Sequence, residues 1–248
     1  MAFGGVQVAR TLLCVNISHA AKLREELGGD VPGPVEAAAI CTQTGCKSIA
    51  VRLSQDRRYI RDSDLFAIRD AMPINGNFCA EMAADDEMIA FAKRLKPDRI
   101  TIVPGKKEEM TPNGGLDVRQ SLARTKDVVE LFRDEGIPVS LFIEPDREAV
   151  DLAKGCGAEF VEICTGAYSK AADKAGIDRE IDRIYRAAEH AADVRIKINA
   201  GCGLNYVNVL PLLDARELLE LNIGRAILSK SASAGLSKAV QEMMEVLD

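Results

Sequence analysis

Residues 195–225 read RIKINAGCGLNYVNVLPLLDARELLELNIGR and contain two short apolar runs that each end in glycine. The first run leads into Gly201-Cys202-Gly203, and the second run, Leu218–Ile223, leads into Gly224-Arg225. Glycines at strand ends expose backbone N–H groups, and two such loops side by side suit an anion. The last two strands of a (β/α)8 barrel commonly bind phosphate in this way. The stretch therefore predicts the end of a parallel barrel and a phosphate site on it.

Apolar runs of strand length recur along the rest of the chain and alternate with longer segments of helical period. The eight candidate strands are Leu12–Ile17, Ser48–Leu53, Asn77–Met82, Arg99–Val103, Val139–Ile143, Phe160–Ile163, Arg195–Asn199 and Leu218–Ile223. The candidate helices are Pro34–Thr44, Ser63–Met72, Asp86–Leu95, Ser121–Glu135, Arg147–Lys154, Arg179–Ala192 and Ser233–Val246. This alternation predicts an α/β fold, a parallel eight-stranded (β/α)8 TIM barrel, with residues 1–248 forming a single domain. An open doubly wound sheet is the alternative, although no GxGxxG fingerprint follows Ile17.

Two connections on the C-terminal side of their strands are longer than a minimal βα loop. They are Pro104–Asp117 and Thr165–Ile177. Barrels build their active sites on that side, and long loops there often act as lids or binding loops. We therefore expect the active site at this end of the barrel.

The composition is that of a soluble globular protein, with 47% hydrophobic and 28% charged residues among 248. The net charge of −6 argues against nucleic acid as a partner, and no apolar run is long enough for a membrane helix. The seven cysteines lack CxxC spacing, and the N-terminus shows no secretory signal. We expect a cytoplasmic protein with no disulfide framework and no metal site.

Polar residues at the predicted strand ends are the candidates for chemistry. Glu81 ends an apolar run, and burial at the barrel mouth raises a carboxyl pKa toward that of a general base. A structural ion pair with Arg52 on the neighbouring strand is an equally good interpretation. The remaining strand-end candidates are Asn16, Ser18, His19, Ser54, Glu144, Glu162, Asn199, Cys202, Asn222, Arg225 and the loop around Thr111.

Two of these candidates have competing interpretations. Cys202 is either a reactive thiol or simply a small residue in a tight phosphate loop, and we favour the second. His19 either donates a hydrogen bond to substrate or caps the following helix. Arg225 follows a glycine at a predicted helix start, where the guanidinium and the helix N-terminus can hold a phosphate together. The Asp56-Arg57-Arg58 cluster is more often a solvated charge run than an anion clamp.

Together these motifs resemble one known family over nearly the whole chain. They are VNISH (15–19), PVEAA (34–38), VRLSQDRRYI (51–60), AEMA (80–83), KPDRITIVPGKKEEMTPNGGLDV (96–118), VSLFIE (139–144), FVEICTG (160–166), INAGCGLNY (198–206) and ELNIGRAI (220–227). The chain in this respect resembles pyridoxine 5′-phosphate synthase. The resemblance implies a (β/α)8 barrel that assembles into octamers and requires no cofactor. It also implies condensation of 1-deoxy-D-xylulose 5-phosphate with 3-amino-2-oxopropyl phosphate, releasing phosphate and water.

The resemblance also implies roles for individual residues. Catalysis falls to Glu81 as general base, to Arg52 and to Cys202, the last two standing where the family has histidines. Substrate or phosphate binding falls to Asn16, Ser18, His19, Ser54, Tyr59, Thr111, Gly203, Gly224 and Arg225. Ser18 replaces a family aspartate, Leu27 and Ser54 replace arginines, and Tyr59 and Arg225 replace histidines.

These replacements leave alternatives to the family reaction open. Because an arginine cannot act as a base near neutral pH, Arg52 cannot take over the role of a histidine. The first alternative is a divergent paralogue with a changed substrate or reaction. The second is a non-catalytic barrel that binds phosphorylated metabolites, and the third is a scaffold that acts through assembly alone.

Overall fold

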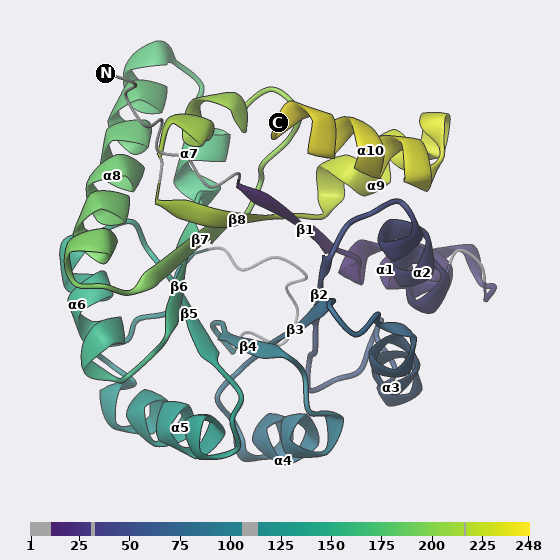
Figure 1. Cartoon of the computed structure of the whole chain (residues 1–248), viewed down its shortest axis with the longest axis horizontal. Helices are drawn as coiled ribbons and strands as arrows, with labels where there is room; N and C mark the ends of the chain where they lie inside the picture. The colour runs from purple at the N-terminus through teal and green to yellow at the C-terminus, as the bar shows by residue number, and fades with distance from the viewer. Residues whose placement is uncertain (1–10, 31–32, 106–113, 216) are drawn as a thin grey trace, which may run out of the picture.

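A computed structural model describes residues 11–30, 33–105, 114–215 and 217–248, and it confirms the predicted barrel (Figure 1). Eight parallel strands pair in chain order, and β8 pairs back with β1 to close the sheet. The strands are β1 (Leu12–Asn16), β2 (Ser48–Arg52), β3 (Asn77–Met82), β4 (Arg99–Ile102), β5 (Val139–Ile143), β6 (Phe160–Cys164), β7 (Lys197–Gly201) and β8 (Leu218–Ile223).

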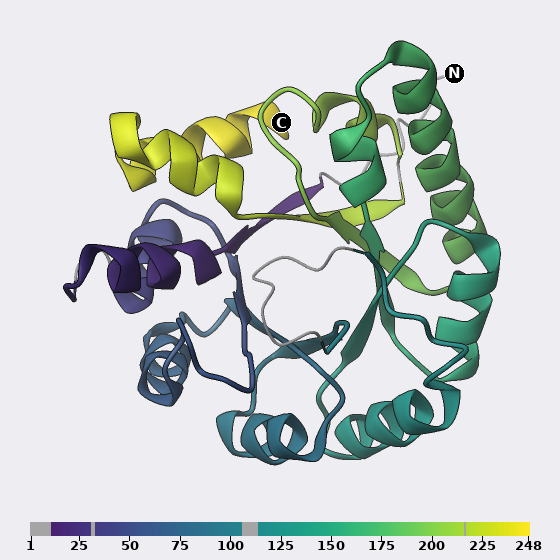
Figure 2. The same cartoon turned by 180° about the vertical axis from the view of Figure 1, so that it is seen from behind.

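Helices surround the ring of strands, as both faces of the molecule show (Figure 1 and Figure 2). They are α1 (Ser18–Leu27), α2 (Pro34–Gln43), α3 (Asp62–Ala71), α4 (Asp86–Leu95), α5 (Leu122–Asp134), α6 (Arg147–Gly155), α7 (Gly166–Lys170), α8 (Lys174–Asp193), α9 (Arg225–Ala234) and α10 (Leu236–Val246), with a 3-10 turn at Leu210–Asp214. Asp85, Asp146 and Asp173 begin three of them, because each carboxylate accepts a hydrogen bond from a backbone N–H three residues on. No helix in these described ranges has the length and apolar character needed to cross a membrane.

The structure corrects several element boundaries. A single helix over Ser233–Val246 was wrong, because Gly235 has a φ of 81° and separates α9 from α10. Strand β7 begins at Lys197 rather than Arg195, whose own φ is 57°. Helices α1 and α7 were not expected, and α8 begins five residues before the predicted Arg179. All of these differences lie at the ends of elements or in the connections between them. The same residues can adopt several backbone conformations there, so a local pattern does not determine the boundary.

Strand residues alternate between two environments, as the period of a β-strand requires. One set, including Val15, Ile49 and Leu141, packs in the large core between strands and helices. The other set points into the barrel, where Cys14, Ala50 and Cys79 form a separate buried cluster. The interior therefore differs in character from the core around it.

Charged and polar residues occupy much of the barrel interior. Arg99 of β4 forms a buried ion pair with Glu220 of β8, on the opposite side of the ring. Glu81 follows the interior residue Cys79 by two positions and therefore lies on the same face of β3. The register also pairs Arg52 with Glu81 across β2 and β3. Strand periodicity thus places both side chains toward the barrel axis.

Candidate active site

A cavity of about 220 Å³ lies at the carboxyl ends of the strands. Strands β1, β3, β5, β6 and β8, helices α1, α7 and α9, and the segments that follow β4 and β7 contribute its walls. The described lining residues are Asn16, His19, Glu81, Val103, Phe142, Glu162, Ser169, Lys170, Cys202, Gly203, Leu204, Asn222, Ile223, Gly224 and Arg225. The two glycine turns of the opening stretch therefore meet at one cavity, together with Glu81.

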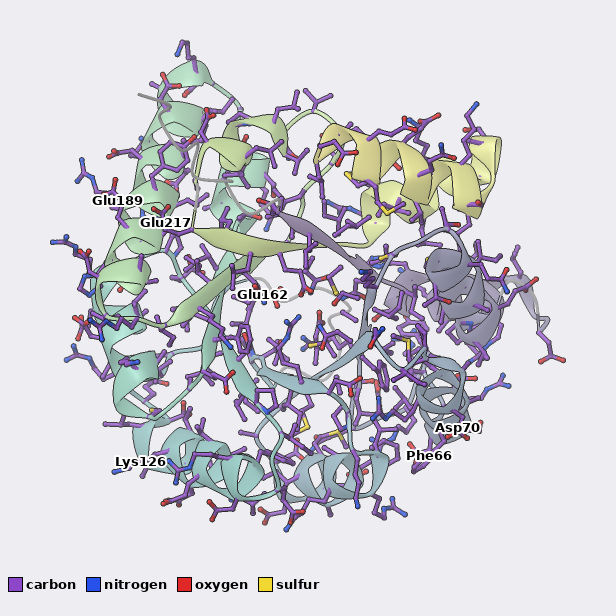
Figure 3. The ribbon with its side chains drawn as sticks, in the orientation of Figure 1. Phe66, Asp70, Lys126, Glu162, Glu189 and Glu217 are labelled. Atoms are coloured by element: carbon purple, nitrogen blue, oxygen red, sulfur yellow. The ribbon has the colours of Figure 1, made fainter. Side chains whose placement is uncertain are left out.

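Two buried glutamates, Glu81 of β3 and Glu162 of β6, face this cavity. The amide of Asn222 connects them, because its Nδ2 donates to Glu81 Oε1 at 2.8 Å and to Glu162 Oε1 at 3.0 Å. Asn16 Nδ2 donates a further hydrogen bond to Glu81 Oε1 at 2.7 Å. Glu162 lies inside the ring of strands in Figure 3. Asn16 and Asn222 thus hold the Glu81 carboxylate in one orientation.

Glu162 holds its proton to a higher pH than an ordinary glutamate does. Burial raises the pKa of Glu162 to about 8, and the negative charge of Glu81 adds to that rise. At neutral pH most Glu162 side chains are therefore neutral acids beside the Glu81 carboxylate. A carboxylic acid that stays neutral beside a second carboxyl group is a usual source of a general acid in catalysis.

The raised pKa of Glu162 gives the protein a specific pH dependence of stability. Folding takes up a proton between about pH 4.5, the ordinary pKa, and pH 8, so stability falls as pH rises through that window. Glu162→Gln removes this loss. By urea denaturation we expect equal unfolding free energies near pH 5 and an advantage of a few kcal/mol for the variant at pH 9. The same pH dependence in both proteins would contradict the assignment.

Cys202 lies in the wall of the cavity on a strained backbone. Its φ of 87° is unusual for a residue with a side chain. The buried Thr165 stabilises this conformation, since its hydroxyl donates to the carbonyls of Gly201 at 2.8 Å and Cys202 at 2.7 Å. A hydrogen bond from the Cys164 thiol lowers the pKa of Cys202, with smaller contributions from the charges of Lys170 and Arg225. The thiol is therefore polarised toward its thiolate.

The strain at Cys202 can be measured by comparing two truncations. Cys202→Ala and Cys202→Gly both remove the thiol, but only glycine adopts a φ near 87° without steric cost. We expect the glycine variant to be more stable than the alanine variant by about 1 kcal/mol, the reverse of their order at an ordinary position. Chemical denaturation of both variants measures the difference. Greater stability of the alanine variant would exclude strain.

Cationic and neutral donors surround the entrance of the cavity. Arg225 is the first residue of α9, where backbone N–H groups lack partners within the helix. Lys170 ends α7 on the other wall. Burial lowers the pKa of His19, and the charges of Arg225 and Lys22 lower it further, so the imidazole is neutral at pH 7. The entrance is therefore suited to an anion, whereas the floor carries the glutamates.

The glycines of the two turns are also required by close packing. A Cβ on Gly201 would lie 2.7 Å from Glu162 Oε1, and one on Gly224 would lie 2.5 Å from the carbonyl oxygen of Asn16. A Cβ on Gly203 would lie 2.1 Å from Ser169 Oγ of α7. These contacts permit no larger side chain, so the glycines determine the shape of the cavity as well as exposing their backbone.

Other residues predicted for the site lie beside the cavity rather than in its described lining. Arg52 is buried next to Glu81, and its Nη2 donates to the carbonyl of Pro104 at 3.0 Å. The buried Ser18 hydroxyl accepts a hydrogen bond from the backbone N–H of Arg52 at 2.8 Å. Thr111 lies outside the described residues.

Two further predicted residues lie in the loop after β2. The Ser54 hydroxyl donates to Asp56 Oδ1 at 2.7 Å, and Tyr59 packs against the core with its carbonyl accepting from Arg24. One arginine of this loop, Arg57, forms ion pairs with Asp62 and Glu87. The structure thus places this loop apart from the cavity lining.

Sequence reasoning gave too little weight to some cavity residues. Glu162 and Asn222 were recognised only as polar strand ends, although the structure makes them the partners of Glu81. Ser169 and Lys170 belong to the long connection after β6, and their position in a loop suspected of binding was their signal. Hydrogen bonding between Glu81 and Asn222 joins residues 141 positions apart, which no local pattern indicates.

Comparison with known proteins identifies the family. The family model described as "Pyridoxal phosphate biosynthesis protein PdxJ" matches residues 13–248. A protein of Photobacterium profundum named pyridoxine 5′-phosphate synthase is 44% identical over 238 residues, which are 96% of this chain and 97% of that protein. The chain belongs to the pyridoxine 5′-phosphate synthase family. A relative of the same name from Pelobacter propionicus is 41% identical over 95% of this chain and 98% of its own length.

Solved structures support the fold at lower similarity. Phosphoribosyl anthranilate isomerase from Thermus thermophilus superimposes with a TM-score of 0.61 at 12% identity, covering 96% of this chain and 98% of that chain. This likeness concerns the barrel alone. Membership of the pyridoxine 5′-phosphate synthase family confirms the resemblance seen in the sequence motifs, while the roles of individual residues stay predictions.

Proposed function

We propose that this protein is a pyridoxine 5′-phosphate synthase, which condenses 1-deoxy-D-xylulose 5-phosphate with 3-amino-2-oxopropyl phosphate. The family supports the reaction class, since relatives of this name match nearly the whole chain. The observation that carries the proposal is the Glu81–Asn222–Glu162 arrangement at a cavity with a cationic entrance. A base, an acid and an anion site are what this condensation requires.

One glutamate accepts a proton during the reaction and the other donates one. The amine of one substrate condenses with the ketone of the other, so the Schiff base forms from the substrates themselves. The Glu81 carboxylate takes a proton from carbon beside the resulting carbonyl or imine. Neutral Glu162 gives its proton to an oxygen that leaves as water. Because Asn222 donates to both carboxyl groups, it keeps them aligned while the protons move.

The phosphate groups are proposed to bind at the entrance. The N-terminus of α9 supplies backbone N–H groups and the positive end of the helix dipole, and Arg225 adds a full charge. Gly203 exposes its backbone across the cavity, and neutral His19 can donate one hydrogen bond. Asn16 joins this end of the cavity to Glu81.

Cys202 and Arg52 are proposed to act as a proton donor and a fixed positive charge. Cys202 lines the cavity, and the hydrogen bond from Cys164 lowers its thiol pKa, so its proton is given up more readily than that of an ordinary thiol. Arg52 is buried beside Glu81 and stays protonated, so it can stabilise negative charge but cannot accept a proton. Ser18, Ser54, Tyr59 and Thr111 remain predicted substrate contacts.

A second candidate is a paralogue with a changed substrate. The observation in its favour is that Arg52, Cys202 and Arg225 stand where the family resemblance predicts histidines. Incubating the purified protein with the two family substrates, and following pyridoxine 5′-phosphate by its absorbance, decides between the candidates. Turnover supports the synthase. Absence of both binding and product supports the paralogue, whereas binding of both substrates without product supports the non-catalytic barrel.

Arg225→Gln tests the phosphate site. Loss of the guanidinium removes a charge-assisted bond, so we expect KM for a phosphorylated substrate to rise about tenfold or more with a smaller change in kcat. Arg186→Gln is the matched control, because Arg186 is an exposed residue of α8 paired with Asp182. Steady-state kinetics measure both. An unchanged KM for each substrate in the Arg225 variant would show that the substrate phosphates bind away from Arg225.

The location and assembly of the protein are also proposed from the family. We infer a cytoplasmic homo-oligomer, an octamer by resemblance, that binds phosphorylated small molecules and not nucleic acid. The net charge of −6 supports the last point. Light scattering of the purified protein measures the assembly.

A further inference from the structure

Two cysteines meet at the wall of the cavity. Strand β6 ends at Cys164, whose Cα partner on β7 is Gly201, so Cys202 lies one residue beyond the paired position. The Thr165 N–H donates to the Gly201 carbonyl at 2.8 Å and fixes the two strand ends together. Neighbouring strands are about 4.8 Å apart and one residue rises about 3.3 Å, so Cα atoms offset by one residue are about 6 Å apart, within the separations that disulfides span.

The thiols point toward each other on this backbone. A Cβ added to Gly166 would lie 3.2 Å from Cys202 Sγ and 3.3 Å from Cys164 Sγ, so both sulfurs flank the same glycine. The Cys164 thiol forms a hydrogen bond with Cys202, and Cys202 packs against the small cluster of Val103, Phe142 and Cys164.

The two thiols differ in access. Cys202 lines the cavity, whereas Cys164 is 3% exposed and lies behind it. The hydrogen bond to Cys202 and burial raise the pKa of Cys164, and burial also raises the pKa of each of the other five cysteines, so Cys202 alone of the seven has a lowered pKa. The five are Cys14, Cys41, Cys46, Cys79 and Cys156. An oxidant that enters the cavity therefore meets Cys202 first, with Cys164 placed to react next.

We propose that Cys202 and Cys164 form a redox-active dithiol, a modification site at which a small peroxide oxidises the pair to a disulfide. The Cys202 thiolate attacks one peroxide oxygen, breaking the O–O bond and leaving a sulfenic acid and hydroxide. The Cys164 sulfur then attacks the Cys202 sulfur, forming the S–S bond and releasing water. For hydrogen peroxide, two thiols lose two electrons and two protons, and the peroxide becomes two waters.

The disulfide changes the cavity wall. Bond formation draws Cys202 Sγ toward Val103 and Phe142, so the cavity loses its thiol. It also ties the start of α7, which carries Lys170, to the turn that carries Gly203. This functional consequence rests on the proposed synthase activity, whereas formation of the bond does not.

Peptide mapping of the whole protein tests the dithiol without reference to activity. Protein treated with hydrogen peroxide is alkylated, digested without reduction and analysed by mass spectrometry. We expect a linked peptide pair containing Cys164 and Cys202, five alkylated cysteines remaining of the seven, and return of all seven after dithiothreitol. A disulfide between other cysteines, such as Cys41 and Cys46, or overoxidised Cys202 without a link would overturn the proposal.

Single cysteine variants distinguish the thiol that reacts with peroxide from the thiol that completes the disulfide. Cys164→Ser leaves Cys202 without its partner, so we expect a sulfenic acid that dimedone traps. Cys202→Ser is expected to leave Cys164 unoxidised, and Cys156→Ser is the matched control that still forms the link. In a protein with turnover, peroxide should lower activity at least about tenfold and dithiothreitol should restore it. A linked pair in a protein without turnover would contradict the proposed function alone, and full activity of the linked protein would contradict the functional consequence.

Discussion

Glu81→Gln is expected to lower kcat for the condensation by about three orders of magnitude while the fold persists. Glutamine has the size of glutamate, and its carbonyl oxygen can still accept from Asn16 and Asn222, which donate at 2.7 and 2.8 Å. The amide cannot accept a proton from substrate. The variant therefore keeps the hydrogen-bonded arrangement and loses the base.

The same variant also alters its partner. The charge of Glu81 contributes to the raised pKa of Glu162, so Glu81→Gln moves that pKa down from about 8, while burial keeps it above the ordinary value. We expect any alkaline limb of the residual activity to shift toward lower pH. The pH profile thus reports the charge coupling between Glu81 and Glu162, while the loss of kcat reports the base.

Glu159→Gln is the matched control for this experiment. Glu159 immediately precedes the strand that carries Glu162, and its exposed carboxylate pairs with Lys197 at the far end of the barrel. We expect wild-type kcat and KM from it. Equal activity of the two glutamine variants would remove Glu81 from the mechanism, whereas denaturation of Glu81→Gln would show a structural role.

Gly224→Ala is expected to cost about 2–4 kcal/mol of stability and nearly all activity. The new Cβ would lie 2.5 Å from the carbonyl oxygen of Asn16 and 3.0 Å from its Cβ. These are backbone and near-backbone atoms, which cannot rotate away. The clash falls at the β1–β8 seam, where Val15 pairs with Ile223 and the barrel closes.

The effect on activity follows from the same contact. Any shift of Asn16 away from residue 224 moves the amide that donates to Glu81 at 2.7 Å. It also changes the approach to the N-terminus of α9, which begins at Arg225. Stability, catalysis and phosphate binding should therefore decline together, as measured by urea denaturation, kcat and KM.

Gly155→Ala provides the control for glycine replacement. Gly155 ends α6 and has no heavy atom within 4 Å of an added Cβ, so alanine should stabilise the protein by about 0.5–1 kcal/mol. If Gly224→Ala were equally well tolerated, the close approach at the seam would be relaxed in solution and the packing argument would be wrong.

The barrel and its order of strands were predictable because each strand is a local apolar run. All eight predicted runs overlap a strand, and three of them, such as Asn77–Met82, match its bounds. The last helix was mispredicted because Ser233–Val246 has continuous helical period on both sides of Gly235, whose left-handed φ breaks it. Periodicity reports which face is buried, not where the backbone turns.

By itself the sequence determined the fold class, the end of the barrel that carries the polar residues, and Glu81 as a candidate base. These follow from period, glycine placement and residue chemistry, all of which are local properties. Only the tertiary structure decided that Asn222 joins Glu81 to Glu162, that burial makes Glu162 a neutral acid, and that Cys164 meets Cys202. These contacts join residues from different strands. The distances between the residues and the burial of their side chains are established only when the sheet closes.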